Sequence, residues 1–383
     1  MFSVVIIDLI GFGVVMPVLP FYAAEFGANA TALGGILAVH AAAQFVFAPI
    51  WGRLSDRIGR RPVLILTVSG TAFALLMLGL ADSLAGVFLA RVLGGAFAAN
   101  VSVASAYLAD VTDDEERTRW MGMLGASFGI GFVLGPALGG GLAPLGYTVP
   151  ILTAAGLAAL NAVHALISLP EPPRHTRETE SFSRRAVLRD PRVRLLCLAN
   201  LVFALAVTQL ETLFPFLARD RLGYGVSEVA FILVGMAIVM GGIQGGGMKA
   251  LAARYPERSL VITGTLLLAL GFAVLPHTPG LALMLLALAV VAVGRAISQP
   301  SLMSLASLSA DPARQGAVMG AFHSAASLAR VVGPAAAGLL YDQLQAAPFW
   351  LAAGLLLVVA GLARGFPERQ ESRAAAAAGS AIP

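Results

Sequence analysis

Five charged side chains lie deep inside long apolar stretches of this 383-residue chain: Asp8, Arg91, Glu211, Arg295 and Arg330. Removal from water disfavours the charged form of a carboxyl group, so an acid in such a place can bind and release a proton. We expect Asp8, Glu211 or both to bind a proton in this way, with Arg91 as a central cation that lowers the pKa of an acid or binds a substrate anion. The alternatives are an acid held in an ion pair or helix cap, and an arginine that reaches out to the headgroups of a lipid bilayer.

Uncharged polar side chains recur on the same apolar stretches. His40 and Gln44 share a helix face through i,i+4 spacing, as do Arg295 and Gln299. A few polar groups in an apolar wall suit the binding of a small hydrophobic compound. The candidate substrate contacts are His40, Gln44, Asn100, Gln209, Arg295, Gln299, Phe214 and Phe322. Each of these side chains has an alternative role in helix packing, and Arg295 with Gln299 could equally hold two helices together.

A short charged segment, Gly52 to Arg61, separates two apolar stretches and contains four arginines and one acid, Asp56. Such a segment cannot lie in lipid, so we expect a tight hairpin loop at a membrane face. Short cytoplasmic loops carry an excess of Lys and Arg, which places this face in the cytoplasm. The candidate gate residues are Gly52, Asp56, Arg57, Gly59, Arg60, Arg61, Asp110 and Arg117. The simpler alternative is that these charges only fix the orientation of the chain.

Glycines recur every four residues at Gly131, Gly135 and Gly139, with Pro136 among them. Small residues at this spacing form a flat helix face that another helix can approach closely, and a proline bends the helix by removing a backbone donor. We expect a tight helix seam at Gly131, Gly135, Pro136 and Gly139.

The elements that must position these residues are membrane-spanning helices. The protein is 58% hydrophobic and only 12% charged, with a mean hydropathy of +0.84, whereas soluble domains are about a quarter charged. Stretches of about 20 apolar residues, the length that crosses a bilayer, occur twelve times, at approximately 2–24, 33–51, 62–81, 84–108, 121–141, 147–169, 193–217, 227–248, 259–276, 280–306, 316–340 and 347–365.

The two halves of the chain resemble each other. Pro20-Phe21 near the end of the first stretch corresponds to Pro215-Phe216 in the seventh, and Gly135-Pro136 to Gly333-Pro334. We therefore predict an all-α membrane protein with twelve transmembrane helices in two pseudo-symmetric six-helix bundles. The predicted parts are a bundle over 1–169, a cytoplasmic linker over 170–192, a second bundle over 193–366 and a disordered tail over 367–383.

The basic residues orient the protein. With both termini inside, 20 of the 25 Lys and Arg residues fall in inner loops and the tail, and two fall in outer loops. This asymmetry follows the positive-inside rule and accounts for a pI near 9.6 without a nucleic-acid partner. We expect a multi-pass protein of the inner membrane with both termini in the cytoplasm.

Several motifs together resemble the major facilitator superfamily. The Gly52–Arg61 segment is similar to the signature between its helices 2 and 3, and Arg91 with Gly94-Gly95 to its helix 4 motif. Residues 125–140 resemble the helix 5 motif of its drug–proton antiporters. Asp8 through Pro20 is similar to helix 1 of tetracycline-type exporters. Two features depart from those exporters: the ninth stretch, 259–276, has no acid, and His40 replaces an aromatic residue.

The resemblance implies a secondary transporter that alternates access between the two membrane faces. Asp56 and its neighbours would latch the cytoplasmic side, helped by the positive end of the eleventh helix. We expect a proton-coupled exporter of small hydrophobic or amphipathic compounds, such as a multidrug or tetracycline-like antiporter. The alternative is a facilitator or symporter for one metabolite or lipid.

The sequence also indicates what the protein is not. It has no Ser/His/Asp arrangement, no metal-spaced Cys/His cluster and no phosphate-binding Gly-Lys-Ser/Thr loop. We therefore expect no enzyme activity, no catalytic or metal-binding residues and no cofactor. The expected partners are a small-molecule substrate, protons and the lipid bilayer, and we expect a monomer.

Overall fold

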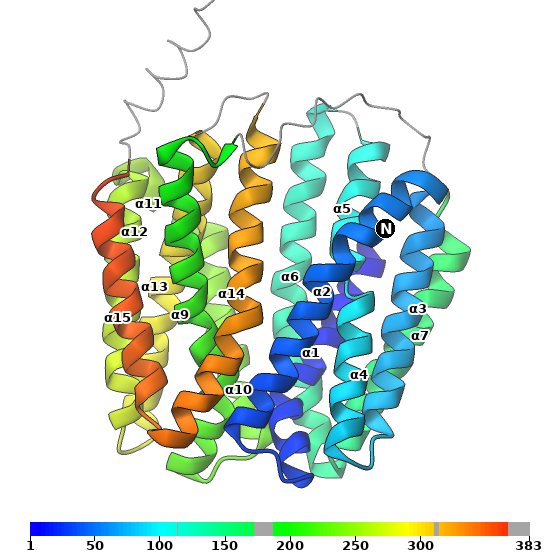
Figure 1. The fold of residues 1–383 in the computed structure, drawn as a ribbon, viewed down its shortest axis with the longest axis horizontal. Helices are drawn as coiled ribbons and strands as arrows, with labels where there is room; N and C mark the ends of the chain where they lie inside the picture. The colour runs from blue at the N-terminus through cyan, green and yellow to red at the C-terminus, as the bar shows by residue number, and fades with distance from the viewer. Residues whose placement is uncertain (113, 172–186, 310–313, 367–383) are drawn as a thin grey trace, which may run out of the picture. The chain divides into compact units, whose positions relative to one another are not determined.

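A computed structural model describes residues 1–112, 114–171, 187–309 and 314–366, with the side chains of 114–119, 121 and 122 outside this description. Within these ranges the protein forms helices and short connections, and no strand (Figure 1). The first half contains α1 (Phe2–Glu25), α2 (Ala30–Ile58), α3 (Arg60–Gly79), α4 (Leu84–Phe97), α5 (Asn100–Val111), α6 (Asp114–Leu142), the short 3₁₀ helix η1 (Ala143–Leu145) and α7 (Thr148–Ser168).

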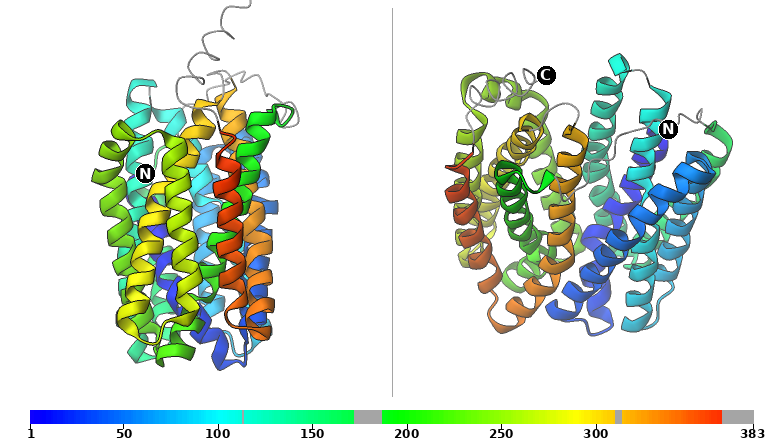
Figure 2. Two further views of the ribbon diagram at one scale, coloured as in Figure 1. Left: turned by 90° about the vertical axis from the view of Figure 1, so that its left-hand side faces the viewer. Right: turned by 45° about the horizontal axis from the view of Figure 1, so that its top comes forward.

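The second half is also helical. It contains α9 (Pro191–Leu222), α10 (Val226–Gly242), the π-helical turn η2 (Ile243–Gly247), α11 (Met248–Arg254), α12 (Glu257–Val274), the 3₁₀ turn η3 (Leu275–His277), α13 (Leu281–Leu308), α14 (Gln315–Gln343) and α15 (Ala347–Ala363). Two further views are given in Figure 2. Most of the predicted linker, 170–192, and the predicted tail lie outside the described residues.

The described helices include ten that are long and apolar enough to cross a membrane. One of the ten combines α4 with α5, and another combines α10, η2 and α11. α15 is apolar but shorter, at 17 residues. The predicted class, an all-helical membrane protein, is confirmed, while the count of twelve crossings stays a prediction.

Contacts between Cα atoms group the protein into two compact units. The first unit contains Met1–Arg177 and Phe214–Ala237, and the second contains Glu178–Leu213 and Ile238–Pro383. In the first unit α1 packs on α6 and α7, and α3 packs on α4 and α7. In the second unit α12 packs on both α13 and α15. This division does not test the two predicted six-helix bundles, which stay a prediction.

Two helices meet in the segment Gly52–Arg61, but the prediction that this segment is a loop is wrong, because almost all of it is helical. α2 continues to Ile58 and α3 begins at Arg60, so Gly59 alone separates the two helices. Gly59 has φ +111°, a conformation that residues with a Cβ atom rarely adopt. One glycine therefore makes the turn, and the charged residues before it stand at fixed helical positions.

The glycine-rich segment of the second half, residues 246–254, is helical as well. The π-helical turn at Ile243–Gly247 leads directly into α11, which ends at Arg254. A π-helical turn inserts one extra residue into a helix without ending it. A Cβ atom added at Gly245 or Gly246 would meet no atom within 4 Å, so packing does not require glycine at these two positions.

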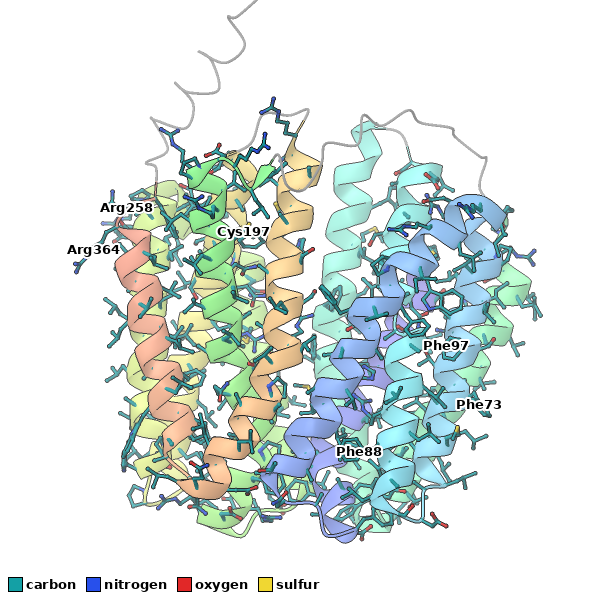
Figure 3. The ribbon with its side chains drawn as sticks, in the orientation of Figure 1. Phe73, Phe88, Phe97, Cys197, Arg258 and Arg364 are labelled. Carbon is teal, nitrogen blue, oxygen red and sulfur yellow. The ribbon has the colours of Figure 1, made fainter. Side chains whose placement is uncertain are left out.

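The fourth apolar stretch, in contrast, is not one continuous helix. α4 ends at Phe97, α5 begins at Asn100, and Ala98 and Ala99 between them form a turn. No proline in this stretch signals a break. Figure 3 labels Phe97, which marks the end of α4.

Side chains from α2 hold the backbone of this break. Gln44 Nε2 donates to Ala98 O at 2.8 Å, and Trp51 Nε1 donates to Ala96 O at 2.6 Å. The Trp51 ring also stacks on Phe97, with 5.7 Å between ring centroids. Inside a membrane an interrupted helix is tolerated only where neighbouring groups satisfy the freed backbone atoms. The break thus depends on contacts from a different helix.

Candidate transport site

Asp8 on α1 and Asn100 on α5 form a polar contact inside the first unit. Asn100 Nδ2 donates to Asp8 Oδ1 at 2.7 Å and lies 3.3 Å from Thr71 Oγ1 on α3. The Asn100 side chain is buried. Among the described residues no basic side chain forms an ion pair with Asp8. An acid held by a neutral amide keeps the option of binding a proton, which a tight ion pair would oppose.

His40, Gln44 and Arg91 lie near the broken helix, but the first two bond to its backbone. His40 places Nδ1 3.1 Å from Arg91 O, and Gln44 bonds to Ala98 O. These contacts tie α2 to α4. Whether either side chain also contacts a substrate stays a prediction.

Arg91 is a buried cation on α4. Its side chain is 8% exposed, and its Nε finds no hydrogen-bond partner within the described residues. A buried charge is unfavourable unless it is paired, and in membrane spans such groups often mark a binding or transport path. A role of Arg91 in proton coupling or in binding an anion stays a prediction.

Glu211 and Arg295 form an ion pair inside the second unit. Arg295 Nη2 on α13 donates to Glu211 Oε1 on α9 at 2.7 Å. Arg295 Nε also lies 3.4 Å from Gln299 Oε1, one turn further along α13. The structure thus brings Glu211, Arg295 and Gln299 together, and the negative charge of Glu211 is compensated within its own unit.

The remaining substrate candidates are buried in helix packing. Gln209 donates to Leu205 O at 3.1 Å and to Gly333 O at 3.3 Å, which joins α9 to α14. Phe214 is 2% exposed and Phe322 is 4% exposed. Asn200 makes a similar link, donating to Phe322 O at 2.8 Å. A role of these side chains in substrate binding stays a prediction.

The charged segment around Gly59 forms a cluster centred on Arg60. Arg60 pairs with Asp56 at 2.5 Å and with Asp110 on α5 at 2.8 Å. Its backbone N–H donates to Glu171 Oε1 at 2.8 Å, just beyond α7. The candidates Asp56, Arg60 and Asp110 therefore meet, and they connect the ends of α2, α3 and α5.

The other gate candidates lie apart from this cluster or outside the description. Arg61 Nη2 donates to Leu166 O on α7 at 2.7 Å. Arg57 is exposed and Gly52 is half-buried. The side chain of Arg117 lies outside the described residues.

The predicted glycine seam of α6 lies against α1. A Cβ atom added at Gly135 would lie 2.5 Å from Gly13 Cα, and one added at Gly139 would lie 2.6 Å from Val14 O. One added at Gly131 would lie 2.6 Å from Leu9 Cβ. Pro136 is buried in the same face. The two backbones are thus too close for any side chain at these positions.

We expect Gly135→Ala to reduce transport severely, because its methyl group would force α1 and α6 apart beside Asp8. Gly129→Ala is the matched control on the same helix, since a Cβ atom there would meet no atom within 4 Å. The measurement is transport in membrane vesicles, normalised to the amount of folded protein. Equal transport by the two variants would contradict a functional role for the seam.

Sequence patterns did not identify some residues of these clusters. Thr71 and Trp51 lack charge, and their polar atoms matter only through contacts with other helices.

Glu257 falls just outside the predicted ninth span, but it is the first residue of α12 and is 7% exposed. It lines a cavity of about 470 Å³ in the second unit, together with Gln244, Met248, Lys249, Ala252, Leu260, Pro300, Ser301 and Ser304.

Curated relatives match nearly the full length of the protein. It is 32% identical over 378 residues to the class D tetracycline resistance protein of Salmonella ordonez, an alignment that spans 94% of this sequence and 95% of that protein. It is 27% identical over 387 residues to multidrug resistance protein 2 of Bacillus subtilis (strain 168), spanning 97% and 96% of the two proteins.

Solved structures share the fold. The human organic anion transporter MFSD10 (TETRAN) superimposes with a TM-score of 0.70 at 27% identity, covering 94% of this protein and 97% of that one. A bacterial homologue of the human lysosomal transporter Spinster gives a TM-score of 0.81 at 15% identity, covering 95% and 94%.

The family profile agrees with both comparisons. The profile described as Major Facilitator Superfamily matches residues 1–250 and 248–381. This match also explains the sequence motifs, the all-helical membrane fold and the charged residues within the spans. The chain belongs to the Major Facilitator Superfamily and is a membrane transporter, not an enzyme.

Proposed function

We propose that this transporter exports small hydrophobic or amphipathic compounds in exchange for protons, by alternating access. The observation that carries the proposal is Asp8, a carboxyl group within a membrane-spanning helix that is bonded to a neutral amide at 2.7 Å. An acid without a cationic partner can change its protonation state during a transport cycle. Glu211, paired with Arg295, is the less suitable of the two acids. The tetracycline and multidrug resistance relatives support export.

Inverted membrane vesicles test this function directly. Their cytoplasmic face points outward, so an exporter loads them with added tetracycline or a fluorescent dye when a proton gradient is imposed. We expect uptake above that of vesicles lacking the protein, and we expect a protonophore to abolish it. Uptake that persists unchanged after the gradient is collapsed would contradict proton coupling.

A second candidate function is the transport of an organic anion by facilitation or symport. Arg91 favours it, because this buried guanidinium has an Nε without a partner in the described residues and would bind an anionic group. The likeness to the human organic anion transporter MFSD10 points the same way. A panel of dyes of similar size and opposite charge separates the candidates. Preferential movement of anions, insensitive to a protonophore, would favour this one.

The cluster at Arg60 supports a cytoplasmic latch with Asp56 as one of its parts. The Asp56 side chain is 61% exposed, so its pair with Arg60 contributes less than about 1 kcal/mol to stability. We therefore expect Asp56→Asn to slow transport while the melting temperature stays nearly constant. Arg53→Gln, an exposed neighbour on the same helix, serves as the control. Unchanged transport by Asp56→Asn would contradict the latch.

We further propose that both termini face the cytoplasm and that the monomer is the working unit. The excess of arginines in the segments assigned to the inside supports this orientation. Labelling of single cysteines introduced near Arg53 and near Asp82 in intact cells tests it. Only the site near Asp82 is expected to react with an impermeant reagent.

A further inference from the structure

Asn100 is the only side chain that hydrogen-bonds Asp8 in the described part of the protein. Its Nδ2 donates to Asp8 Oδ1 at 2.7 Å, while its Oδ1 is buried without a hydrogen-bond partner in that same part. The side chain is 7% exposed, so water gives the free oxygen little compensation. A buried acceptor left unpaired is unfavourable, and its place next to an ionisable group calls for an explanation.

The hydrogen-bonding chemistry of Asp8 and Asn100 explains this unpaired oxygen. An ionised carboxylate can only accept hydrogen bonds, whereas a protonated carboxyl group also donates one through its O–H. A primary amide carries both kinds of partner on one planar group, two N–H donors and a carbonyl acceptor. The last torsion of an asparagine side chain has two broad, nearly equivalent orientations. A half-turn of the amide therefore exchanges its donor for its acceptor without moving the backbone.

We propose that Asn100 hydrogen-bonds both protonation states of Asp8: its amide N–H donates to the carboxylate, and after a half-turn its Oδ1 accepts from the protonated acid. Asn100 is then a positioning residue, and its unpaired oxygen is the acceptor of the second state. This inference rests on the proposed function, in which Asp8 takes up the proton.

Thr71 fixes the first of the two orientations. Its hydroxyl donates to Thr67 O at 3.0 Å, which leaves Oγ1 as an acceptor 3.3 Å from Asn100 Nδ2. Both contacts of Nδ2, with Asp8 and with Thr71, require an N–H donor on that side. The orientation described here is thus the one that fits an ionised Asp8.

Other ionisable groups on the helices around α1 are engaged elsewhere. On α7, His164 Nε2 lies 2.8 Å from Ser3 Oγ, and on α5 Asp110 pairs with Arg60. The Tyr107 hydroxyl on α5 donates to Pro170 O. α6 has no ionisable side chain between residues 123 and 142. Arg91 lies on α4, before the turn at Ala98 and Ala99, and forms no ion pair with Asp8 among the described residues. Among the described residues, Asn100 is therefore the side chain in direct hydrogen-bond contact with Asp8 when its protonation changes.

Infrared difference spectroscopy between low and high pH tests the proposal on the full-length protein in lipid. The C=O stretch of protonated Asp8 is assigned by its loss in Asp8→Asn. We expect Asn100→Leu to move this band to higher frequency, because the acid loses its acceptor. Wild-type protein that contains ¹³C-labelled asparagine should also show an amide C=O band that moves to lower frequency on protonation and whose shift is lost in Asp8→Asn. This second measurement needs no change at Asn100.

The matched control is Asn161→Leu. Asn161 is another fully buried asparagine whose Nδ2 contacts α1, donating to Val4 O at 2.8 Å, and whose Oδ1 is also unpaired among the described residues. It does not touch Asp8, so its replacement should leave the Asp8 band unchanged. Transport by Asn100→Leu should fall by at least about tenfold, the factor for one hydrogen bond to a charged group. Asn100→Gln, which keeps the amide, should restore part of it.

Two results would overturn the proposal: an Asp8 band at the same frequency in wild type and Asn100→Leu, or an equal shift in Asn161→Leu. The underlying function fails separately. Normal proton-coupled transport by Asp8→Asn would remove Asp8 as the proton site. Loss of transport in Asp8→Asn, together with an Asp8 band that Asn100→Leu leaves at the wild-type frequency, would refute only the role of Asn100.

Discussion

Asp8→Asn is expected to reduce proton-driven uptake into inverted vesicles to the level of vesicles that lack the protein. Asparagine has nearly the shape of aspartate and can still bond to Asn100, so the packing of α1 should survive. What it lacks is a group that ionises. Coupling requires the site to alternate between two protonation states, and an amide offers only one. Exchange of substrate down its own gradient should persist, because that process does not need the proton.

Comparing proton-driven uptake with exchange down the substrate gradient separates a loss of coupling from a loss of folding. A variant that has merely lost its fold would fail in both. Asp82→Asn, an exposed acid between α3 and α4, is the control and should transport normally. Proton-driven uptake by Asp8→Asn at the wild-type rate would exclude Asp8 as the proton site and leave Glu211 as the remaining acid of the two.

The second large effect concerns stability and the pair of Glu211 with Arg295. Glu211→Gln leaves Arg295 without its partner in a membrane span, where a single charge is unfavourable by about 2.5–3.5 kcal/mol on insertion scales. The two side chains are 32% and 24% exposed, so we expect the lower part of this range. Arg295→Gln should be milder, because an unpaired Glu211 can become neutral by protonation while an arginine cannot.

A double-mutant cycle measures this pair. The double variant, with Glu211→Gln and Arg295→Gln, should be more stable than the single variant Glu211→Gln, since no unpaired charge remains. Thermal unfolding in detergent, followed by intrinsic tryptophan fluorescence, gives the melting temperatures of the wild type, the two single variants and the double variant. Losses that simply add in the double variant would show that the two side chains do not interact.

The sequence predicted the spans well and their interruptions poorly. Long apolar stretches report burial in lipid directly, so each predicted span falls on described helices. The break after Phe97 has no local signal, because donors from α2, Gln44 and Trp51, replace the missing helical bonds. At Gly59 the sequence signal was instead stronger than the structural feature. Its charges indicated a loop, yet one glycine suffices for the turn.

The candidate site was likewise predictable only in part from the sequence. Residue type alone identified Asp8, Arg91, Glu211 and Arg295 as unusual, because charges in membrane spans are rare. The pairing of these residues could not be read in the same way. Asn100 bonds to Asp8, 92 positions earlier in the sequence, a contact that was not predicted, while its expected contact with a substrate stays a prediction. Such partners are set by how helices pack, and single-sequence patterns do not contain that information.

The ion pair between Glu211 and Arg295 also constrains how the protein is made. The two residues are 84 positions apart, so at a synthesis rate of about 5–20 residues per second Arg295 leaves the ribosome roughly 4–17 seconds after Glu211. During this interval α9 must enter the membrane with an unpaired acid. Its carboxyl group can be neutralised only by a proton or sheltered by the insertion machinery until α13 arrives. We therefore expect membrane assembly of the second half to be sensitive to the pace of translation between Glu211 and Arg295.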